Sequence, residues 1–190
     1  RKDRRQEIED ELDKVSAKKR FRIEGNYDEM NGVRGCVQSH IQALDFAIAK
    51  EWKNALILED DCCFTKSEAE IDSYIQKFIS HFKGDWDVFF LGTYVKFARL
   101  TDHPDYVQVH FSLKSHAYVV NGPYIRKLRD HFISTYEAVK DDPLFVFSLT
   151  KALDRRWVDL QLNDRWFAGK EMITRQRESF SDIEKEMKQH

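Results

Sequence analysis

The stretch Ala55-Leu56-Ile57-Leu58-Glu59-Asp60-Asp61 decides the expected fold, because four apolar residues run directly into three carboxylates. A short apolar run of this kind is typical of a buried strand in a parallel sheet. Such sheets bind ligands in the crevice beyond the carboxyl ends of their strands. Three acids in a partly desolvated crevice repel one another, so they favour a divalent cation as partner. A solvated acidic turn is the alternative interpretation of the triplet on its own.

The composition indicates one globular domain that spans residues 1–190, since 42% of the residues are hydrophobic and no linker is evident. A net charge of −2 gives no general electrostatic reason to bind nucleic acid or an anionic membrane. No apolar run approaches a membrane span, and no signal peptide is evident. The three cysteines form no even framework, which favours reduced thiols and a cytoplasmic protein. Because the sequence begins with Arg1, we expect a fragment.

Helices and strands alternate along the chain. Apolar residues at helical spacing predict helices around Ile8–Val15, over Cys36–Trp52, over Ile71–Phe82, and after the Asn121-Gly122-Pro123 turn. Apolar runs predict strands over Ala55–Leu58, over Trp86–Leu91 with an end at Gly92, over Val107–Phe111, and over Ala117–Val120. In the second helix we expect one stripe to pack against the strand Ala55–Leu58, formed by Val37, Ile41, Leu44 and Ile48. The alternation is that of a single α/β domain.

Several short segments follow one another in the order found in one enzyme family. They are Asp3-Arg4-Arg5, Gly35–His40, Leu56–Asp61, Asp85-Trp86-Asp87 with Leu91-Gly92, Ser115–Val119, Gln176 and Ser181–Glu184. In this order they resemble the family 25 glycosyltransferases, which include lipooligosaccharide and procollagen galactosyltransferases. The resemblance implies a glycosyltransferase-A, Rossmann-like domain with a mixed, mostly parallel central sheet. It also implies a nucleotide-sugar donor, Mn²⁺ or Mg²⁺, and inversion at the anomeric carbon.

Two features depart from the family pattern. The family opens with a strand that reads like Ile-Asn-Leu just before the segment matching Asp3-Arg4-Arg5, and that strand is absent here. The connection from Val15 to Gly35 is also shorter than in many members. Both departures concern the amino-terminal side, where donor contacts are expected.

The chemistry of nucleotide-sugar transfer suits the three carboxylates, although the sequence alone leaves open which of Glu59 and Asp60 binds the metal, the ribose or a structural partner. A departing nucleoside diphosphate gathers negative charge, and a hard cation with oxygen ligands stabilises it. We expect Asp61 and Glu59 on the metal, facing the same side of an extended segment, with Asp60 facing away and binding the donor. Further donor-binding candidates come from the matching segments, and they are Arg4, Gly35, Ser39, His40, Gln176, Ser181 and Asp182. Each has a structural alternative: His40 is more often a packing residue, and Gly35 also permits a turn.

Inverting transfer requires a base that takes the proton of the acceptor hydroxyl. The prediction is Asp159, in the segment Arg156-Trp157-Val158-Asp159-Leu160, with Asp154 and Asp164 as neighbouring alternatives. A helix-capping or surface role is the other interpretation of Asp159.

The sequence as a whole therefore predicts a metal-dependent inverting glycosyltransferase. It would move a hexose, galactose or glucose, from a UDP-sugar to a hydroxyl of a glycan or of a hydroxylysine-type acceptor. A catalytically silent nucleotide-sugar-binding or glycan-binding domain is the alternative. A metal-dependent nuclease is a further one, but a catalytic lysine beside the acids and a basic binding face do not stand out.

Overall fold

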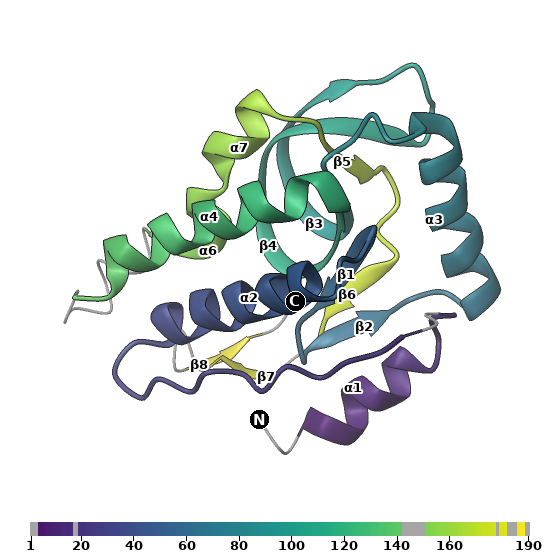
Figure 1. Ribbon diagram of the computed structural model, residues 1–190. Helices are drawn as coiled ribbons and strands as arrows, with labels where there is room; N and C mark the ends of the chain where they lie inside the picture. Colours follow the sequence, from purple (N-terminus) through teal and green to yellow (C-terminus); the bar gives the residue numbers. More distant parts are fainter. Residues whose placement is uncertain (1–3, 17–18, 142–150, 178, 182–185, 189–190) are drawn as a thin grey trace.

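The computed structural model describes residues 4–16, 19–141, 151–177, 179–181 and 186–188, and Figure 1 shows a central sheet with helices on both sides. The helices are α1 (Arg5–Leu12), α2 (Gly32–Ala49), α3 (Glu68–Phe82), α4 (Gly122–Val139), α6 (Leu153–Arg156) and α7 (Val158–Asn163). The strands are β1 (Asn54–Leu58), β2 (Cys62–Phe64), β3 (Val88–Leu100), β4 (Tyr106–Asn121), β5 (Trp166–Gly169), β6 (Thr174–Gln176), β7 (Ser179–Ser181) and β8 (Glu186–Lys188).

The central sheet is mixed, with the strand order β1-β4-β3-β5. Strand β4 runs antiparallel to β1, β3 and β5, and among the described strands only β3 and β5 pair in parallel. The α/β class is confirmed, whereas the prediction of a mostly parallel sheet is wrong. Strands β1, β3 and β5 nevertheless point the same way, because β4 separates β1 from β3. The acid triplet therefore still follows the carboxyl end of a strand.

Two long strands replace the shorter ones that were predicted. Strand β3 does not end at Gly92 but passes it with a shift of register, and β4 joins the two predicted segments into one strand. Gly92 allows this because a Cβ there would lie 2.3 Å from Thr174 Oγ1 and 2.8 Å from His116 Nε2. The glycine thus marks a close approach inside a bulged strand rather than the end of a strand.

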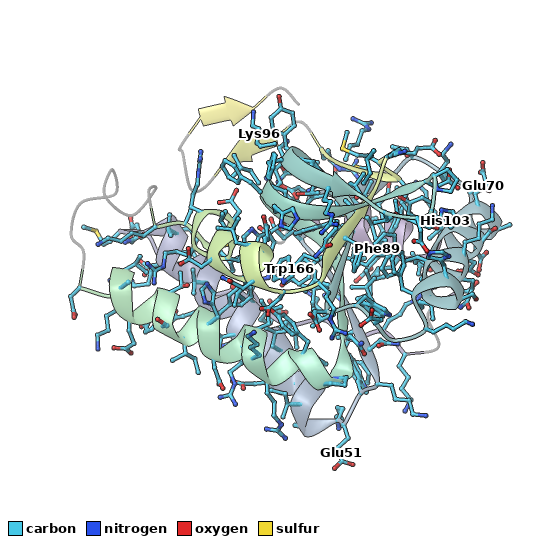
Figure 2. All side chains as sticks on the ribbon, turned by 90° about the horizontal axis from the view of Figure 1, so that it is seen from above. Glu51, Glu70, Phe89, Lys96, His103 and Trp166 are labelled. Carbon is cyan, nitrogen blue, oxygen red and sulfur yellow. The ribbon has the colours of Figure 1, made fainter. Side chains whose placement is uncertain are left out.

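Helices cover both faces of the sheet, and successive residues of the strands alternate between them. In β3, Val88 and Phe90 join the core beneath α2 and α4, whereas Phe89 and Leu91 join the core beneath α3. Figure 2 shows Phe89 and Trp166 between the layers, with Lys96 and Glu51 at the periphery. Burial of both faces explains the continuous apolar runs, which do not require parallel neighbours.

Helix α2 begins four residues before its predicted start and ends three residues before its predicted end. The side chain of Asn31 accepts a hydrogen bond from the backbone N–H of Arg34 at 3.2 Å, which caps the first turn. The predicted apolar stripe is confirmed, since Val37 and Leu44 are fully buried in the same core as Ala55 of β1. Ile41 and Ile48 pack at the edge of that core. The helix lies beside α4 in Figure 1.

Among the helices that the structure describes, none is long and apolar enough to span a bilayer. The three cysteines all belong to the described residues and are not joined by disulfides. Cys62 and Cys63 are buried in β2, and Cys36 is half-buried on α2.

Candidate active site

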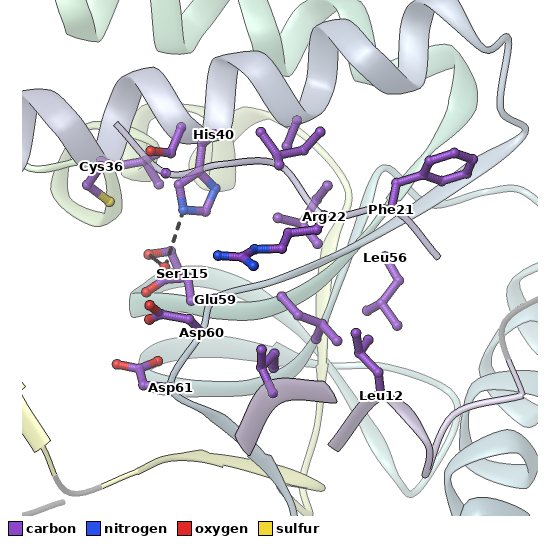
Figure 3. Close-up of a pocket in the computed structure, with 18 of the residues that line it drawn as sticks. Leu12, Phe21, Arg22, Cys36, His40, Leu56, Glu59, Asp60, Asp61 and Ser115 are labelled. Carbon is purple, nitrogen blue, oxygen red and sulfur yellow. Dashed lines mark hydrogen bonds and ion pairs between the residues drawn. The ribbon is translucent and has the colours of Figure 1, made fainter. Parts of the chain in front are cut away.

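The three acids lie on a tight turn between β1 and β2. The backbone N–H of Cys62 donates to the carbonyl of Glu59 at 3.1 Å, which closes the turn. The segment is therefore not extended, and the predicted alternation of side chains does not hold. Figure 3 shows Glu59, Asp60 and Asp61 one below the other at the same end of one cleft.

The cleft has a volume of about 1690 Å³ and is bordered by α1, residues 19–31, α2, β1 and the start of α6. Its polar end contains the acids, and its apolar end contains Leu12, Phe21 and Leu56 (Figure 3). The apolar end follows β1, which pairs with β4 along one edge and with no other strand of the described part. Small-molecule sites ordinarily occupy about 300–1,000 Å³, so this cleft has room for more than one ligand group.

Asp60 and Asp61 share one cation, the guanidinium of Arg4. Arg4 Nη1 lies 2.8 Å from Asp60 Oδ1 and 3.8 Å from Asp61 Oδ2, and the Arg4 side chain is only 8% exposed. Gln176, which reaches the cleft from β6, donates to Asp61 Oδ2 at 3.5 Å. These contacts bring four of the predicted site residues, Arg4, Asp60, Asp61 and Gln176, together at one end of the cleft.

Asp61 carries the clearest electrostatic anomaly of the site. Its Oδ1 is buried and has no hydrogen-bond partner among the described residues. Burial, followed by the charge of Glu59, raises the pKa of Asp61 to about 7, against the effect of Arg4. A buried carboxylate oxygen without a donor, beside two further acids, fits a divalent cation with oxygen ligands.

Glu59 has the opposite environment although it is two residues away. Ser115 Oγ donates to Glu59 Oε1 at 2.5 Å, and His40 Nε2 lies 3.3 Å from the same oxygen. The other ring nitrogen of His40 bonds to the buried hydroxyl of Tyr118 at 2.8 Å. Burial alone would raise the pKa of Glu59, but the hydrogen bond and charge of His40, together with Ser115, hold it below its usual value.

An unusual backbone conformation presents Ser115 to the cleft. The preceding residue, Lys114, has a φ of 80°, which side-chain-bearing residues rarely adopt. Its backbone N–H donates to Asp154 Oδ2 at 2.9 Å, and the hydroxyl of Thr93 donates to the carbonyl of Leu113 at 2.7 Å. Asp154 in turn lines the cleft from α6, and burial raises its pKa.

Ser39 and Gly35 hold the segment 19–31 against α2. The hydroxyl of Ser39 accepts from the backbone N–H of Asn26 at 2.8 Å and donates to the carbonyl of Gly35 at 2.8 Å. A Cβ at Gly35 would lie 2.3 Å from the carbonyl oxygen of Asn26. Gly35 thus lies inside α2, where the backbone of Asn26 packs against it. We predicted that Gly35 would let the backbone approach the donor at a helix amino terminus, but the space beside it is filled by Asn26.

The structure does not bring Asp159 to the cleft. Asp159 is exposed in the first turn of α7, whereas Gln161 of the same helix is buried against Ser112 of β4. A six-residue helix can turn only one side to the sheet, and Asp159 lies on the other. Asp164 is also remote from the cleft lining and pairs with Tyr124 at 2.6 Å and Lys127 at 2.7 Å. We therefore withdraw Asp159 as the predicted base.

Two further predicted donor contacts have no described side chain. Ser181 ends β7, which pairs with β8, and Asp182 lies outside the described residues.

Three residues of the cleft were not predicted from sequence as site residues. Cys36 and Ser115 lie beside Glu59, and Arg22 extends its guanidinium toward them from the segment 19–31 (Figure 3). Cys36 and Ser115 both lie in segments that resemble the enzyme family, and Cys36 is also four residues from His40 on one helix. Arg22 lies in a stretch without periodicity, and its position depends on the way the segment crosses the cleft.

No known protein-family model matches the chain, and no curated protein matches it either.

Proposed function

We propose that this chain is a metal-dependent inverting glycosyltransferase that moves a hexose, galactose or glucose, from a UDP-sugar to a hydroxyl group. The acceptor would be a glycan or a hydroxylysine-type side chain. The observation that carries the proposal is the environment of Asp61: a buried carboxylate oxygen without a partner, at the acidic end of a large cleft. The order of short segments shared with the family 25 glycosyltransferases supports the same activity.

Asp60 and Asp61 are the residues best suited to hold Mn²⁺ or Mg²⁺. Glu59 was also predicted as a ligand of this cation, but its Oε1 faces Ser115 and His40, so we assign it to that group of side chains instead. When bound, a hard cation would stabilise the negative charge of the leaving diphosphate. Arg4, which lies within 4 Å of both aspartates, would contact the same diphosphate and contribute a second positive charge.

The cleft offers different surroundings to the donor and to the acceptor. Its apolar end, with Phe21 and Leu56, provides surface for the flat face of a nucleobase. Its polar end, near Ser115 and Asp154, provides hydrogen-bond partners for sugar hydroxyls. A ligand that extends from one end to the other would have its diphosphate beside Asp60 and Asp61.

Asp154 is the group we assign as catalytic base in place of Asp159. It lines the same cleft as Asp61, and burial raises its pKa above its usual value, which makes the carboxylate a stronger base. Its Oδ2 is held by the backbone N–H of Lys114, so the carboxylate is fixed in position. It would take the proton of the acceptor hydroxyl as that oxygen attacks the anomeric carbon.

The alternative functions predict different binding behaviour. A silent nucleotide-sugar-binding domain would bind the donor but transfer nothing. A silent glycan-binding domain would bind sugar without a need for metal. A nuclease would bind nucleic acid, for which the net charge of −2 gives no general attraction.

Calorimetry with UDP and Mn²⁺ tests the proposal. We expect UDP to bind in the presence of Mn²⁺ and binding to collapse when EDTA is added. Asp61→Asn should remove the metal-dependent part, whereas Asp159→Asn, which removes an exposed carboxylate away from the cleft, should not. Equal affinity for UDP with and without metal would contradict the proposal. A screen of UDP-sugars for hydrolysis and transfer then identifies the donor and separates an enzyme from a silent binding domain.

A further inference from the structure

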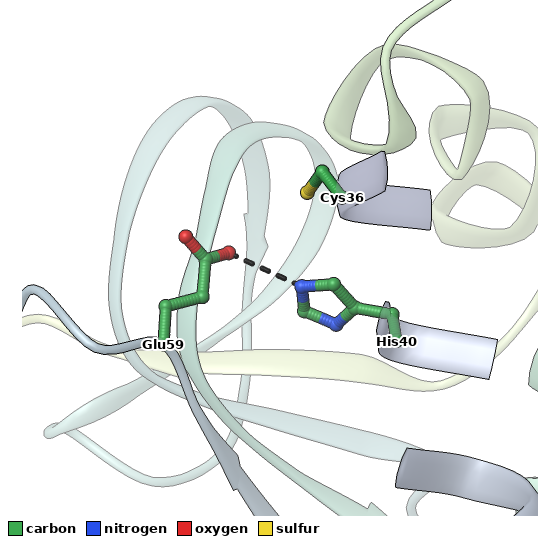
Figure 4. A group of neighbouring side chains, drawn as sticks. All are labelled: Cys36, His40 and Glu59. Carbon is green, nitrogen blue, oxygen red and sulfur yellow. Dashed lines mark ion pairs between the residues drawn. The ribbon is translucent and has the colours of Figure 1, made fainter. Parts of the chain in front are cut away.

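A second group of potential metal ligands lies beside the acid turn. Cys36 and His40 are four residues apart on α2 and therefore share one face of the helix, and Glu59 faces them from the end of β1 (Figure 4). The thiol, one ring nitrogen and one carboxylate oxygen all lie within 4.8 Å of one another. We propose that these three side chains bind a thiophilic divalent cation, with Zn²⁺ as the type, at a site separate from Asp60 and Asp61.

The distances suit a tetrahedral site. Zinc binds histidine nitrogen and carboxylate oxygen at about 2.0–2.2 Å, which places two such ligands roughly 3.4 Å apart at a tetrahedral angle. His40 Nε2 and Glu59 Oε1 are 3.3 Å apart, close to that separation. The thiol of Cys36 lies within 4.8 Å of the other two ligand atoms. Because zinc–sulfur bonds are about 2.3 Å long, the sulfur belongs about 3.6 Å from those atoms and would have to move by up to about 1.2 Å.

The ligands are oriented by partners of their own. The hydroxyl of Tyr118, which is fully buried, bonds to His40 Nδ1 at 2.8 Å and so directs Nε2 toward Glu59. The hydroxyl of Ser115 donates to Glu59 Oε1, the oxygen that faces His40, at 2.5 Å and so holds the carboxylate in place. Metal-binding histidines are commonly held in this way through the nitrogen that does not bind the metal.

A cation would bind Cys36 as the thiolate. In the metal-free chain burial, followed by the charge of Glu59, raises the pKa of the Cys36 thiol well above its usual value, so the thiol would release its proton as the cation binds. A soft thiolate and an imidazole together select zinc-like cations, whereas Asp60 and Asp61 offer only hard oxygen ligands. The two sites therefore differ in the cation that they prefer.

The site is open to the cleft. Cys36, His40 and Glu59 all line it, so a water molecule or a ligand group can occupy the fourth position of a tetrahedron. Three protein ligands with one open position distinguish this arrangement from a closed structural zinc site.

Titration of the metal-free chain with Co²⁺ tests the inference directly, because cobalt bound to a thiolate gives a charge-transfer absorption band. We expect binding of one Co²⁺ with this band, and displacement by Zn²⁺. Cys36→Ser should abolish the band and weaken Zn²⁺ binding by at least about tenfold, since even the loss of a residue that only orients a ligand costs about 10–100-fold. Cys63→Ser, which changes a cysteine of β2 outside the group, should retain both.

A second measurement keeps the inference falsifiable if Cys36→Ser fails to fold. In the unaltered chain, bound Zn²⁺ should slow alkylation of Cys36 at least tenfold, as followed by mass spectrometry of the peptide that contains it. An unchanged cobalt band in Cys36→Ser, or alkylation of Cys36 that Zn²⁺ does not slow, would overturn the proposal. Binding of UDP with Mn²⁺ is measured separately and depends on Asp60 and Asp61, so the failure of either proposal leaves the other intact.

Discussion

Asp61→Asn should stabilise the metal-free chain at alkaline pH while it removes metal binding. In the folded chain, burial and the charge of Glu59 raise the pKa of Asp61 from 3.8 to about 7. One pKa unit corresponds to about 1.36 kcal/mol, so keeping Asp61 ionised at pH 8 costs the folded chain up to roughly 4 kcal/mol. The amide avoids this cost but introduces a buried NH₂ group. We therefore expect the free energy of unfolding to rise by roughly 1–3 kcal/mol at pH 8.

The sign of the pH dependence follows from the raised pKa. Between about pH 4 and pH 7 the folded chain holds a proton on Asp61 that the unfolded chain has released, so the stability of the unaltered chain falls as pH rises through this window. Asp61→Asn lacks this proton. The difference in the free energy of unfolding between Asp61→Asn and the unaltered chain should therefore be small at pH 4, increase up to about pH 7, and stay constant at higher pH.

Urea unfolding in EDTA at pH 4.5 and pH 8 measures the effect, followed by the same experiment with Mn²⁺. Asp60→Asn is the matched control, because Asp60 is more exposed and its loss removes the closer partner of Arg4. That variant should gain no stability at pH 8. Added Mn²⁺ should stabilise the unaltered chain and not Asp61→Asn, because a ligand stabilises only the state that binds it. A loss of stability in Asp61→Asn that is equal at both pH values would refute the reasoning.

The other expected outcomes concern the core, the base and the cation. Leu44→Ala should lower the free energy of unfolding, measured by urea titration, by about 2–5 kcal/mol. The control is Leu162→Ala, because the side chain of Leu162 is 56% exposed; it should change this free energy by no more than about 0.5 kcal/mol. Asp154→Asn should slow transfer by about 10²–10⁴-fold with near-normal donor binding, as measured by steady-state kinetics. Asp159→Asn should leave the same rates nearly unchanged. If Asp159→Asn is the slower variant, Asp159 and not Asp154 is the catalytic base. Mn²⁺ affinity should increase up to about tenfold per pH unit and level off near pH 7, where Asp61 loses its proton, whereas a flat profile would contradict that competition.

The sequence predicted the helices and the strand before the acids well, because their signals are local. The apolar stripe of α2, the run of β1 and the turn at Asn121 each specify an element within a few residues. The direction of the strands was not predictable in the same way. Apolar residues on both faces of β3 report burial by helices on both sides, and this burial is the same for parallel and antiparallel neighbours. Gly92 was misinterpreted for a related reason, since its contact partner Thr174 is 82 residues away along the chain.

The part of the site that consists of residues adjacent in sequence could be predicted. The part that depends on how distant segments pack together could not. The acid turn belongs to the first kind. Asp154 and Asp159 belong to the second, because they are only five positions apart in the sequence and the packing of α6 and α7 decides which one lines the cleft. The burial of Gln161 against β4 fixes the orientation of α7 and leaves Asp159 exposed. No local pattern in this segment carries that information.

The contrast between Glu59 and Asp61 explains why a run of three acids can remain next to a buried strand. Ser115 and His40 stabilise the ionised form of Glu59, and Tyr118 holds His40 in place, so the pKa of Glu59 is lowered. Asp61 Oδ2 lies 3.8 Å from Arg4 Nη1 and accepts a long hydrogen bond from Gln176, whereas its buried Oδ1 has no donor among the described residues, and the pKa of Asp61 is raised. Satisfying one carboxylate makes the second harder to ionise, because the charge of Glu59 acts directly on Asp61. A site with one fixed negative charge and one that ionises near neutral pH can accept a cation on Asp61 without first breaking the hydrogen bonds of Glu59.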